Sequence, residues 1–336
     1  VIDLSSNDYL GLAMRPELQA EFFSREGATA IPLTSSASRL LASRQDEYAS
    51  LEALLTELYG RPVLLFNSGY HANTGAISAL ADERTLIVAD KLVHASIIDG
   101  MRLSGASMER FRHNDVNHLE RILSRKAGSF DRVLIVTESV FSMDGDKAPL
   151  DDIVQVKSRY GQALLYVDEA HAFGVEGPHG LGLCASMPEV YFIVGTLGKA
   201  GASVGAFIVC SPLCRDYLLN RARSFIFSTA IPPLNCAWSV FIIEKILAMD
   251  DGRARLRRLG QQLARITGAS SGHIQPLVTG SAESAVALSS RLLEHGFKVL
   301  PIRTPTVPPG TERLRFSLSL DVTEADLERL SAIDLT

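Results

Sequence analysis

Lys199 and Asp168 are the first residues whose surroundings in the sequence indicate chemistry. Lys199 lies between a glycine and an alanine in the segment Gly195–Ala200, shortly after an apolar run that ends at Val194. A lysine in such a site readily lowers its pKa and forms Schiff bases. Asp168 directly follows the apolar run Leu164–Val167. A carboxylate buried there needs a cationic or hydrogen-bonding partner.

A second group of residues is suited to binding an anion. The turn Ser68-Gly69-Tyr70 opens a predicted helix, and Thr196 lies close to Lys199 in the sequence. Backbone N–H groups at the start of a helix favour phosphate. A phosphate cradle, a carboxylate, an aromatic-type stacking group and a lysine together describe a site for pyridoxal 5'-phosphate (PLP). In such a site the acid meets the pyridinium nitrogen and the lysine meets the aldehyde.

A competing interpretation comes from residues 168–171, which spell the DEAH sequence of helicases. That interpretation needs an upstream phosphate-binding loop of the form GxxxxGK[ST]. The Gly-Lys pair of this chain, Gly198-Lys199, lies downstream instead. Ile193 stands at the position of the first glycine, and Ala200 replaces the hydroxyl residue. A net charge of −5 also opposes binding to nucleic acid, so we reject the helicase interpretation.

The residues above follow short apolar runs that predict the strands of a largely parallel sheet. Continuous apolar runs are typical of strands buried on both faces, and strands that alternate with amphipathic helices indicate an α/β fold. Ligands bind beyond the carboxyl ends of the strands in such a sheet, so the polar residues after five runs should meet at one edge. The predicted strands are Val63–Phe66, Thr85–Ala89, Val133–Thr137, Leu164–Val167, Phe192–Val194 and Ala206–Val209, and the helix candidates between them include Tyr48–Tyr59, Val116–Lys126 and Leu150–Tyr160.

The length of the chain, 336 residues, is typical of two domains. We predict an N-terminal segment over residues 1–40, a large PLP-binding domain over 41–240 and a small α+β domain over 241–336. The elements predicted toward the C-terminus are a helical stretch Trp238–Ala269, a strand Ile274–Val278, a helix Ala282–His295, a strand Arg313–Leu320 and a helix Thr323–Ile333.

Composition excludes several classes of protein. The chain is 46% hydrophobic and 21% charged, so it can bury a large core. Its most apolar stretch is interrupted by prolines and charged residues, and its first residues lack a signal-peptide pattern. The four cysteines match neither a disulfide framework nor a zinc site. We therefore expect a cytoplasmic protein that binds no metal, no membrane and no nucleic acid.

Seven short motifs, in one order along the chain, resemble the α-oxoamine synthases. These are fold-type I PLP enzymes that join an amino acid to an acyl thioester and release carbon dioxide. The resemblance implies an aspartate aminotransferase-like fold, PLP as the cofactor and a homodimer with shared active sites. The motifs are Ser5–Gly11, Ser68–Tyr70, His94–Ser96, Glu138–Gly145, Val167–Ala172, Gly195–Ala200 and Pro305–Arg315.

The resemblance assigns a role to each motif residue of the cofactor site. Lys199 would bind PLP covalently and move the proton of the amino acid's Cα, and Asp168 would pair with the pyridinium nitrogen. His171 would contact the ring hydroxyl, and His94 would stack on the ring face. The further cofactor contacts that it implies are Ser68, Gly69, Tyr70, Ser142 and Thr196, with Ser228 and Thr229 reaching the phosphate across the dimer interface.

The resemblance also implies substrates. Asn7 and Arg315 match groups near the substrate carboxylate, where a guanidinium can bind in a bidentate way, and Thr306 matches a position near the acyl group. The proline-rich loop Ile302–Pro308 is most similar to that of the family members that act in biotin synthesis. Those enzymes join L-alanine to pimeloyl-CoA or a pimeloyl carrier protein. The alternatives are a sister enzyme that uses glycine with acetyl-CoA or succinyl-CoA, and a non-catalytic partner subunit. Retention of both Lys199 and Asp168 argues against the latter.

Overall fold

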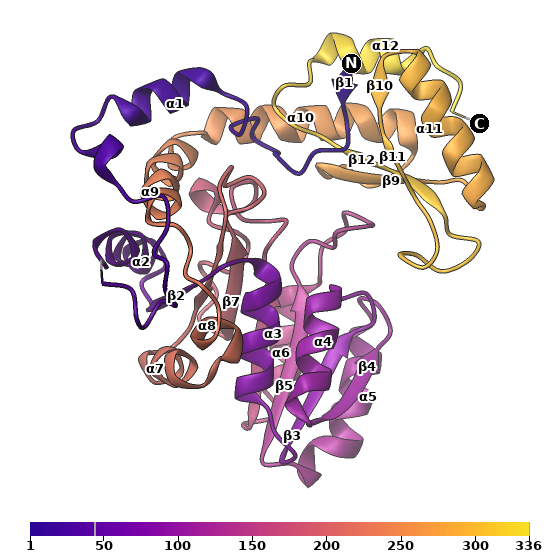
Figure 1. The fold of residues 1–336 in the computed structure, drawn as a ribbon. Coiled ribbons are helices and arrows are strands. Elements are labelled where there is room, and N and C mark those ends of the chain that lie inside the picture. The colour runs from indigo at the N-terminus through magenta and orange to yellow at the C-terminus, as the bar shows by residue number, and fades with distance from the viewer. Residues whose placement is uncertain (44, 336) are drawn as a thin grey trace. The chain divides into compact units, whose positions relative to one another are not determined.

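The computed structural model describes residues 1–43 and 45–335. The chain divides into two compact units (Figure 1). The large unit comprises residues 15–140 and 147–248, and the small unit comprises residues 1–14, 141–146 and 249–336. This division groups the first 14 residues and the segment 141–146 with the C-terminal residues, whereas the predicted domains had bounds at 40 and 240.

A seven-stranded sheet forms the centre of the large unit. Strand β8 runs antiparallel to both of its neighbours, and the remaining strands pair in parallel. This arrangement confirms the predicted α/β fold with a largely parallel sheet. In spatial order the strands are β2 (Val63–Phe66), β8 (Ala206–Val209), β7 (Val190–Thr196), β6 (Ala163–Asp168), β5 (Arg132–Glu138), β3 (Thr85–Asp90) and β4 (Ser107–Phe111).

Helices surround this sheet, and several begin at a side chain that caps them. Asp115 accepts a hydrogen bond from the backbone N–H of His118 at the start of α5, for example, as an N-cap residue should. The helices of the large unit are α1 (Pro16–Phe23), α2 (Asp46–Tyr59), α3 (Gly69–Leu80), α4 (Ala95–Ser104), α5 (Val116–Lys126), α6 (Leu150–Lys157), α7 (Pro212–Arg221), α8 (Arg223–Ile226) and α9 (Pro233–Leu247), with short 3-10 helices η1 (Ala28–Ala30), η2 (Ala127–Ser129) and η3 (Pro178–Gly180).

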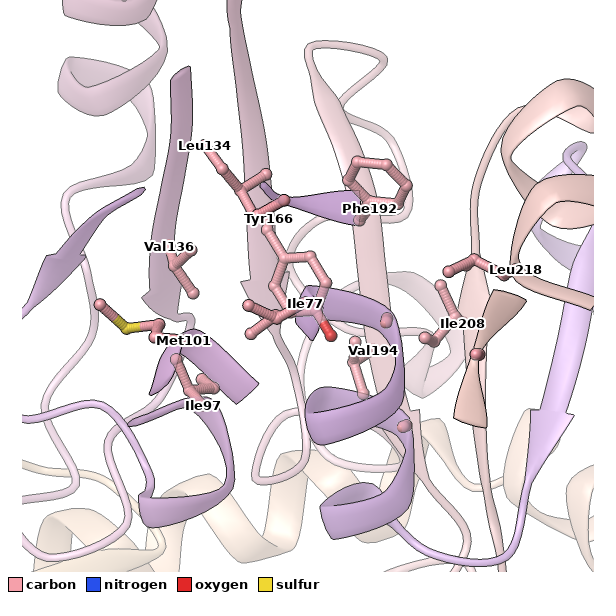
Figure 2. Close-up of a cluster of buried hydrophobic side chains, with 14 of the residues drawn as sticks. Ile77, Ile97, Met101, Leu134, Val136, Tyr166, Phe192, Val194, Ile208 and Leu218 are labelled. Carbon is pink, nitrogen blue, oxygen red and sulfur yellow. The ribbon is translucent and has the colours of Figure 1, made fainter. Parts of the chain in front are cut away.

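One hydrophobic core joins the sheet to helices α3, α4 and α7 (Figure 2). Side chains of the central strands, among them Val136 and Tyr166, meet Ile77 of α3 and Met101 of α4. Ile135 points to the other face of β5 and is equally buried. Both faces of the sheet are therefore covered, which explains why its strands read as continuous apolar runs. The core thereby fixes α3 against the strands that carry the polar edge.

The small unit is built on a second, antiparallel sheet. Its strands lie in the order β11 (Leu300–Ile302), β12 (Arg313–Ser317) and β9 (Ile274–Val278), and β1 (Ile2–Asp3) pairs in parallel with β10 (Phe297–Lys298). Its helices are α10 (Asp250–Thr267), α11 (Ala282–Glu294) and α12 (Glu324–Ser331). The backbone N–H of Ser317 donates to the carbonyl of Leu4 at 2.8 Å, which ties the first residues of the chain to β12. Gly145 has a φ of +67°, and a Cβ there would lie 2.0 Å from the Ile274 carbonyl oxygen, so this close approach requires glycine.

Several elements differ from the prediction; for example, the predicted strand Arg313–Leu320 ends at Ser317. The stretch Trp238–Ala269 is not one helix, because α9 ends at Leu247 and α10 begins at Asp250, where the chain passes from the large to the small unit. Strand β4 was not predicted, because only Phe111 of its five residues is buried at this edge of the sheet. Within residues 1–43 and 45–335, no helix is both long enough and apolar enough to cross a membrane.

Candidate active site

The carboxyl ends of the strands carry the predicted polar site. Glu138, Asp168 and Thr196 are the last residues of β5, β6 and β7, and these strands pair in parallel. A cavity of about 140 Å³ opens at this edge. It lies wholly within the large unit and is lined by Gly69, Tyr70, Asn73, His94, Ser96, Glu138, Asp168, Ala170, His171, Thr196 and Lys199.

The Lys199 side chain contacts the imidazole of His171, with 2.7 Å between Nζ and Nε2. Lys199 reaches this position because the chain turns sharply after β7. A Cβ on Gly195 would lie 2.2 Å from the Phe207 ring, and a Cβ on Gly201 would lie 2.7 Å from the Leu197 carbonyl oxygen. Only glycine therefore fits at either position. Gly195 and Gly201 thus have a steric reason, and Lys199, which lies between them, lines the cavity.

Asp168 is 4% exposed, and hydrogen-bond donors satisfy both of its oxygens. Oδ1 accepts from the backbone N–H of Ala170 at 2.8 Å, and Oδ2 accepts from the amide of Asn73 at 2.7 Å. The same amide donates to Ser96 Oγ at 2.9 Å, and Asn73 Oδ1 accepts from the Tyr166 hydroxyl at 2.8 Å. The sequence had assigned no role to Asn73. Its signal in the sequence was its place in the polar segment 67–73, which follows the apolar run Val63–Phe66.

His94 caps helix α4, and its ring is oriented by Ser96. The backbone N–H of Ser96 donates to His94 Nδ1 at 3.2 Å, so Nδ1 is an acceptor and the ring proton of the neutral form sits on Nε2. Burial lowers the pKa of His94 and outweighs the neighbouring Asp168 carboxylate, which acts to raise it, so the imidazole is neutral at pH 7. The backbone N–H of His94 donates to Glu138 Oε1 at 2.6 Å.

Glu138 is a second buried carboxyl group in the cavity wall, and the sequence had assigned no role to it. Burial raises the pKa of Glu138 well above its ordinary value, and the neighbouring Asp168 raises it further. Two carboxyl groups this close favour different protonation states. We take Asp168 as the charged carboxylate of this pair, because each of its oxygens accepts a hydrogen bond. Like Asp168, Glu138 ends an apolar strand, and that position was the signal available in the sequence.

The start of helix α3 faces the same cavity. Ser68 caps this helix by accepting from the backbone N–H of His71 at 3.3 Å, and its Oγ lies 2.8 Å from the ring Nδ1 of His71. Gly69 lies at the first position of the helix, whose leading N–H groups have no partner within the helix. The Tyr70 hydroxyl donates to Asp99 Oδ2 at 2.6 Å. Thr196 Oγ1 donates to a backbone carbonyl and accepts from a backbone N–H, each at 3.2 Å.

Ser228 and Thr229 do not line this cavity. They lie between α8 and α9. The Thr229 carbonyl accepts from the side-chain amide of Asn67, and Thr229 forms an isolated antiparallel bridge with Ser38. Their predicted contact with a phosphate across a dimer interface stays a prediction.

Three of the remaining predicted residues come together in the small unit. Arg315 Nε donates to the Ser142 carbonyl at 2.5 Å, and Arg315 Nη2 donates to Asn7 Oδ1 at 3.1 Å. Ser142 thus contributes its backbone carbonyl to this group. Thr306 lies apart from them, exposed in the loop between β11 and β12, where its backbone N–H donates to the Arg303 carbonyl at 2.9 Å.

The polar side chains in the cavity fit PLP. An amine, a buried carboxylate and two imidazoles are the partners that an aldehyde, a pyridinium nitrogen, a ring hydroxyl and an aromatic face require. The open N-terminus of α3 supplies backbone N–H groups for a phosphate. Among the residues that the structure describes, no group of three or more His, Cys, Asp or Glu side chains could hold a metal ion.

Comparison with known proteins agrees with this chemistry. The family model for aminotransferase class I and II matches residues 1–332. The chain is 47% identical to an 8-amino-7-oxononanoate synthase of Haemophilus ducreyi over 99% of this chain and 90% of that protein. An 8-amino-7-oxononanoate synthase structure from Francisella tularensis superposes with a TM-score of 0.81 at 29% identity, over 99% of this chain and 97% of that one. A serine palmitoyltransferase variant of S. paucimobilis with a bound PLP–myriocin aldimine superposes with a TM-score of 0.90 at 30% identity, over 98% and 85% of the two chains.

Proposed function

Because this chain belongs to the aminotransferase class I and II family, we propose that it condenses L-alanine with a pimeloyl thioester to form 8-amino-7-oxononanoate. The predicted fold-type I architecture is confirmed, and the protein is a PLP-dependent acyltransferase similar to 8-amino-7-oxononanoate synthase. In the proposed reaction, the alanine Cα gives up its proton and forms a bond to the acyl carbonyl carbon as the C–S bond breaks. The bond from Cα to the carboxylate then breaks, and Cα takes up a proton in its place. The thiol carrier and carbon dioxide leave.

One observation carries this proposal. The amine of Lys199, the carboxylate of Asp168 and the imidazoles of His94 and His171 line a single cavity at the carboxyl edge of the sheet. The 47% identity to an 8-amino-7-oxononanoate synthase over nearly the whole chain supports L-alanine and a pimeloyl thioester as the substrates. The same identity supports biotin synthesis as the pathway that uses the product.

We propose that Lys199 is the catalytic residue that handles the proton. PLP, when bound, withdraws the electron pair that remains on the substrate Cα after a bond to it breaks. Lys199 would hold the PLP aldehyde covalently and, once the substrate amine has replaced it, take the proton from Cα through its Nζ. His171 Nε2 lies 2.7 Å from that Nζ, and a hydrogen bond between the two atoms would orient the lysine amine.

Asp168 and His94 are the other two catalytic residues that we propose. Asp168 is held by two donors and supplies a fixed negative charge for a pyridinium nitrogen, which preorganises the site electrostatically. His94 presents a neutral imidazole, suited to lie against an aromatic ring. The N–H groups at the start of α3, with Thr196, would hold the phosphate.

We further propose that Asn7 and Arg315 bind the substrate carboxylate and that Thr306 contacts the acyl group. The Arg315 guanidinium already shares one N–H with Asn7 Oδ1, and it has further donors for a carboxylate. Ser228 and Thr229 would complete the phosphate site of a second copy of the chain. The working form would then be a homodimer.

A product assay tests the proposed function. The purified protein with PLP is given L-alanine, glycine or L-serine, each with pimeloyl-CoA, a pimeloyl carrier protein, acetyl-CoA or succinyl-CoA, and the ketone product, carbon dioxide and free thiol are measured. L-Alanine with a pimeloyl thioester should be turned over fastest. Faster turnover of glycine with acetyl-CoA or succinyl-CoA would identify a sister synthase. No turnover with any pair, together with no change in PLP absorbance on adding amino acids, would indicate a non-catalytic subunit.

A further inference from the structure

Tyr9 is a buried tyrosine whose hydroxyl reaches the group of residues around Arg315. Its side chain is fully buried, and its ring lies edge-on to the His273 ring with 4.4 Å between centroids. The Tyr9 carbonyl accepts from the backbone N–H of Leu320 at 3.1 Å. The hydroxyl donates to Asn7 Oδ1 at 3.1 Å, and it also contacts the Arg315 side chain. Burial of the ring against His273 and the backbone hydrogen bond from Leu320 thus hold Tyr9 in a fixed position beside Asn7.

The turn that follows Tyr9 is also firmly held. Asp8 Oδ1 accepts from the backbone N–H of Leu12 at 3.0 Å, and Oδ2 accepts from that of Ala13 at 2.8 Å. Gly11 has a φ of +63° in this turn, and a Cβ there would lie 2.9 Å from an Asp321 carboxylate oxygen. The segment that carries Asn7 is therefore held in place independently of the Asn7 side chain.

The orientation of the Asn7 amide follows from its two partners. The atom named Oδ1 lies 3.1 Å from both the Tyr9 hydroxyl and Arg315 Nη2. A guanidinium only donates hydrogen bonds, so the amide atom that faces it must be the carbonyl oxygen. The Nδ2 group then lies on the other side of the amide, and Asn7 is an exposed residue. Asn7 therefore offers two N–H donors outward from a group that also contains the Arg315 guanidinium.

We propose that Tyr9 is a positioning residue that holds the Asn7 amide with its Nδ2 directed at the carboxylate of the amino acid. This inference rests on the proposed function only in that an α-amino acid binds beside Asn7 and Arg315. One hydrogen bond from Arg315 leaves the amide free to swing about that contact, whereas two donors on the same oxygen fix its plane. Burial raises the pKa of Tyr9 to about 12, so the hydroxyl keeps its proton and remains a donor throughout the neutral range.

The Tyr9→Phe variant tests this role, because it removes the hydroxyl and keeps the buried ring. The PLP-loaded protein is titrated with L-alanine and with L-alaninol, which has a hydroxymethyl group in place of the carboxylate, and the absorbance of PLP is followed. Loss of one hydrogen bond should raise the Kd for L-alanine about three- to tenfold. The Kd for L-alaninol should not change. Tyr59→Phe is the matched control, since it removes another buried hydroxyl, which donates to the Leu181 carbonyl at 2.7 Å, and should change neither Kd.

A double-mutant cycle shows whether Tyr9 acts through Asn7. In the Asn7→Ala background, Tyr9→Phe should weaken L-alanine binding less than it does in the wild-type background, with any remaining loss due to the contact of the hydroxyl with Arg315. An unchanged Kd for L-alanine in Tyr9→Phe would overturn the proposal, and so would an equal weakening of L-alanine and L-alaninol, which indicates a general structural defect. If the wild-type protein prefers glycine or L-serine, the titration uses that amino acid with methylamine or ethanolamine as the partner without a carboxylate. Failure of the proposed substrate and failure of the Tyr9 role are then separate results.

Discussion

Replacement of Asn73 by leucine should destabilise the large unit, because this amide lies at the centre of a buried network. Asn73 is 1% exposed and uses both of its N–H groups and its oxygen. The amide nitrogen donates to Asp168 Oδ2 and Ser96 Oγ, and the oxygen accepts from the Tyr166 hydroxyl. A leucine of similar size fills the space and supplies none of these bonds. Ser96 Oγ keeps its contact with His94 Nδ1 at 2.7 Å, so the loss falls mainly on Asp168 and Tyr166.

The expected cost follows from these two stranded groups. A buried donor or acceptor without a partner costs about 1–3 kcal/mol, and more when it is charged. Tyr166 is fully buried, and Asp168 loses one of the two donors that stabilise its charge. We therefore expect Asn73→Leu to lower the free energy of unfolding by about 3–5 kcal/mol. Such a loss is a large share of the stability of a typical domain.

Urea unfolding of the PLP-free protein measures this change without a contribution from cofactor binding. Asn220→Leu in helix α7 is the matched control, because Asn220 is exposed and its amide donates only to the Asp216 carbonyl; it should shift the free energy of unfolding by less than about 0.5 kcal/mol. Tyr166→Phe should destabilise the wild-type protein but stabilise the Asn73→Leu variant, since it removes the hydroxyl left without a partner. If Asn73→Leu cost no more than the control, or if Tyr166→Phe lowered stability equally in both backgrounds, the network would not have the energy that we assign to it.

Three further predictions concern Lys199, Asp168 and Glu169. Lys199→Ala should abolish turnover and the borohydride-reducible attachment of PLP, whereas Lys126→Ala on the surface should change neither; an adduct that persists in Lys199→Ala would exclude the assignment. Asp168→Asn should still bind PLP but slow turnover by orders of magnitude, because a fixed negative charge is lost, and an unchanged rate of proton exchange at the Cα of L-alanine would contradict this. Burial raises the pKa of Glu169 from 4.5 to about 7, so between these pH values the folded protein holds a proton that the unfolded chain has lost, and the free energy of unfolding should fall by about 3 kcal/mol as pH rises through this window. Glu169→Gln should flatten that fall in urea unfolding at several pH values, and parallel curves for the two proteins would refute it.

The central sheet and its functional edge could be predicted because the information is local. Strands β2 and β8 occupy the predicted runs Val63–Phe66 and Ala206–Val209. Helix α5 spans the predicted Val116–Lys126. Burial on both faces of a strand leaves an uninterrupted apolar run, and the residue after that run is placed at the edge by the strand itself. Asp168 could therefore be assigned to the edge without knowledge of its neighbours.

Other elements could not be predicted, because their pattern is shared by alternatives. Strand β4, Ser107–Phe111, has one buried residue and resembles a loop in sequence. The break between α9 and α10 lies next to Asp250, whose carboxylate accepts from Arg253 at 2.7 Å. Acidic residues such as this are favourable in the first turn of a helix, but they are equally common on the exposed face of a helix that continues through them. Periodicity alone does not separate these cases, so the helical stretch predicted over Trp238–Ala269 did not locate the break between α9 and α10.

The residues that orient the site depend on tertiary packing. Asn73 precedes Asp168 by 95 positions, and only the packing of α3 on the sheet brings its amide to that carboxylate. Tyr9 and Asn7 are close in sequence, but the Arg315 that settles the amide orientation is 308 positions from Asn7. In both cases the orienting group keeps the same charge near neutral pH. The Asn73 amide, which holds Asp168, does not ionise, and the Tyr9 hydroxyl, which holds Asn7, stays protonated because burial raises the pKa of Tyr9 to about 12. The pH dependence of turnover should therefore arise from groups such as His94, whose pKa burial lowers, and a pH–rate profile displaced by Tyr9→Phe would contradict a purely positioning role for that hydroxyl.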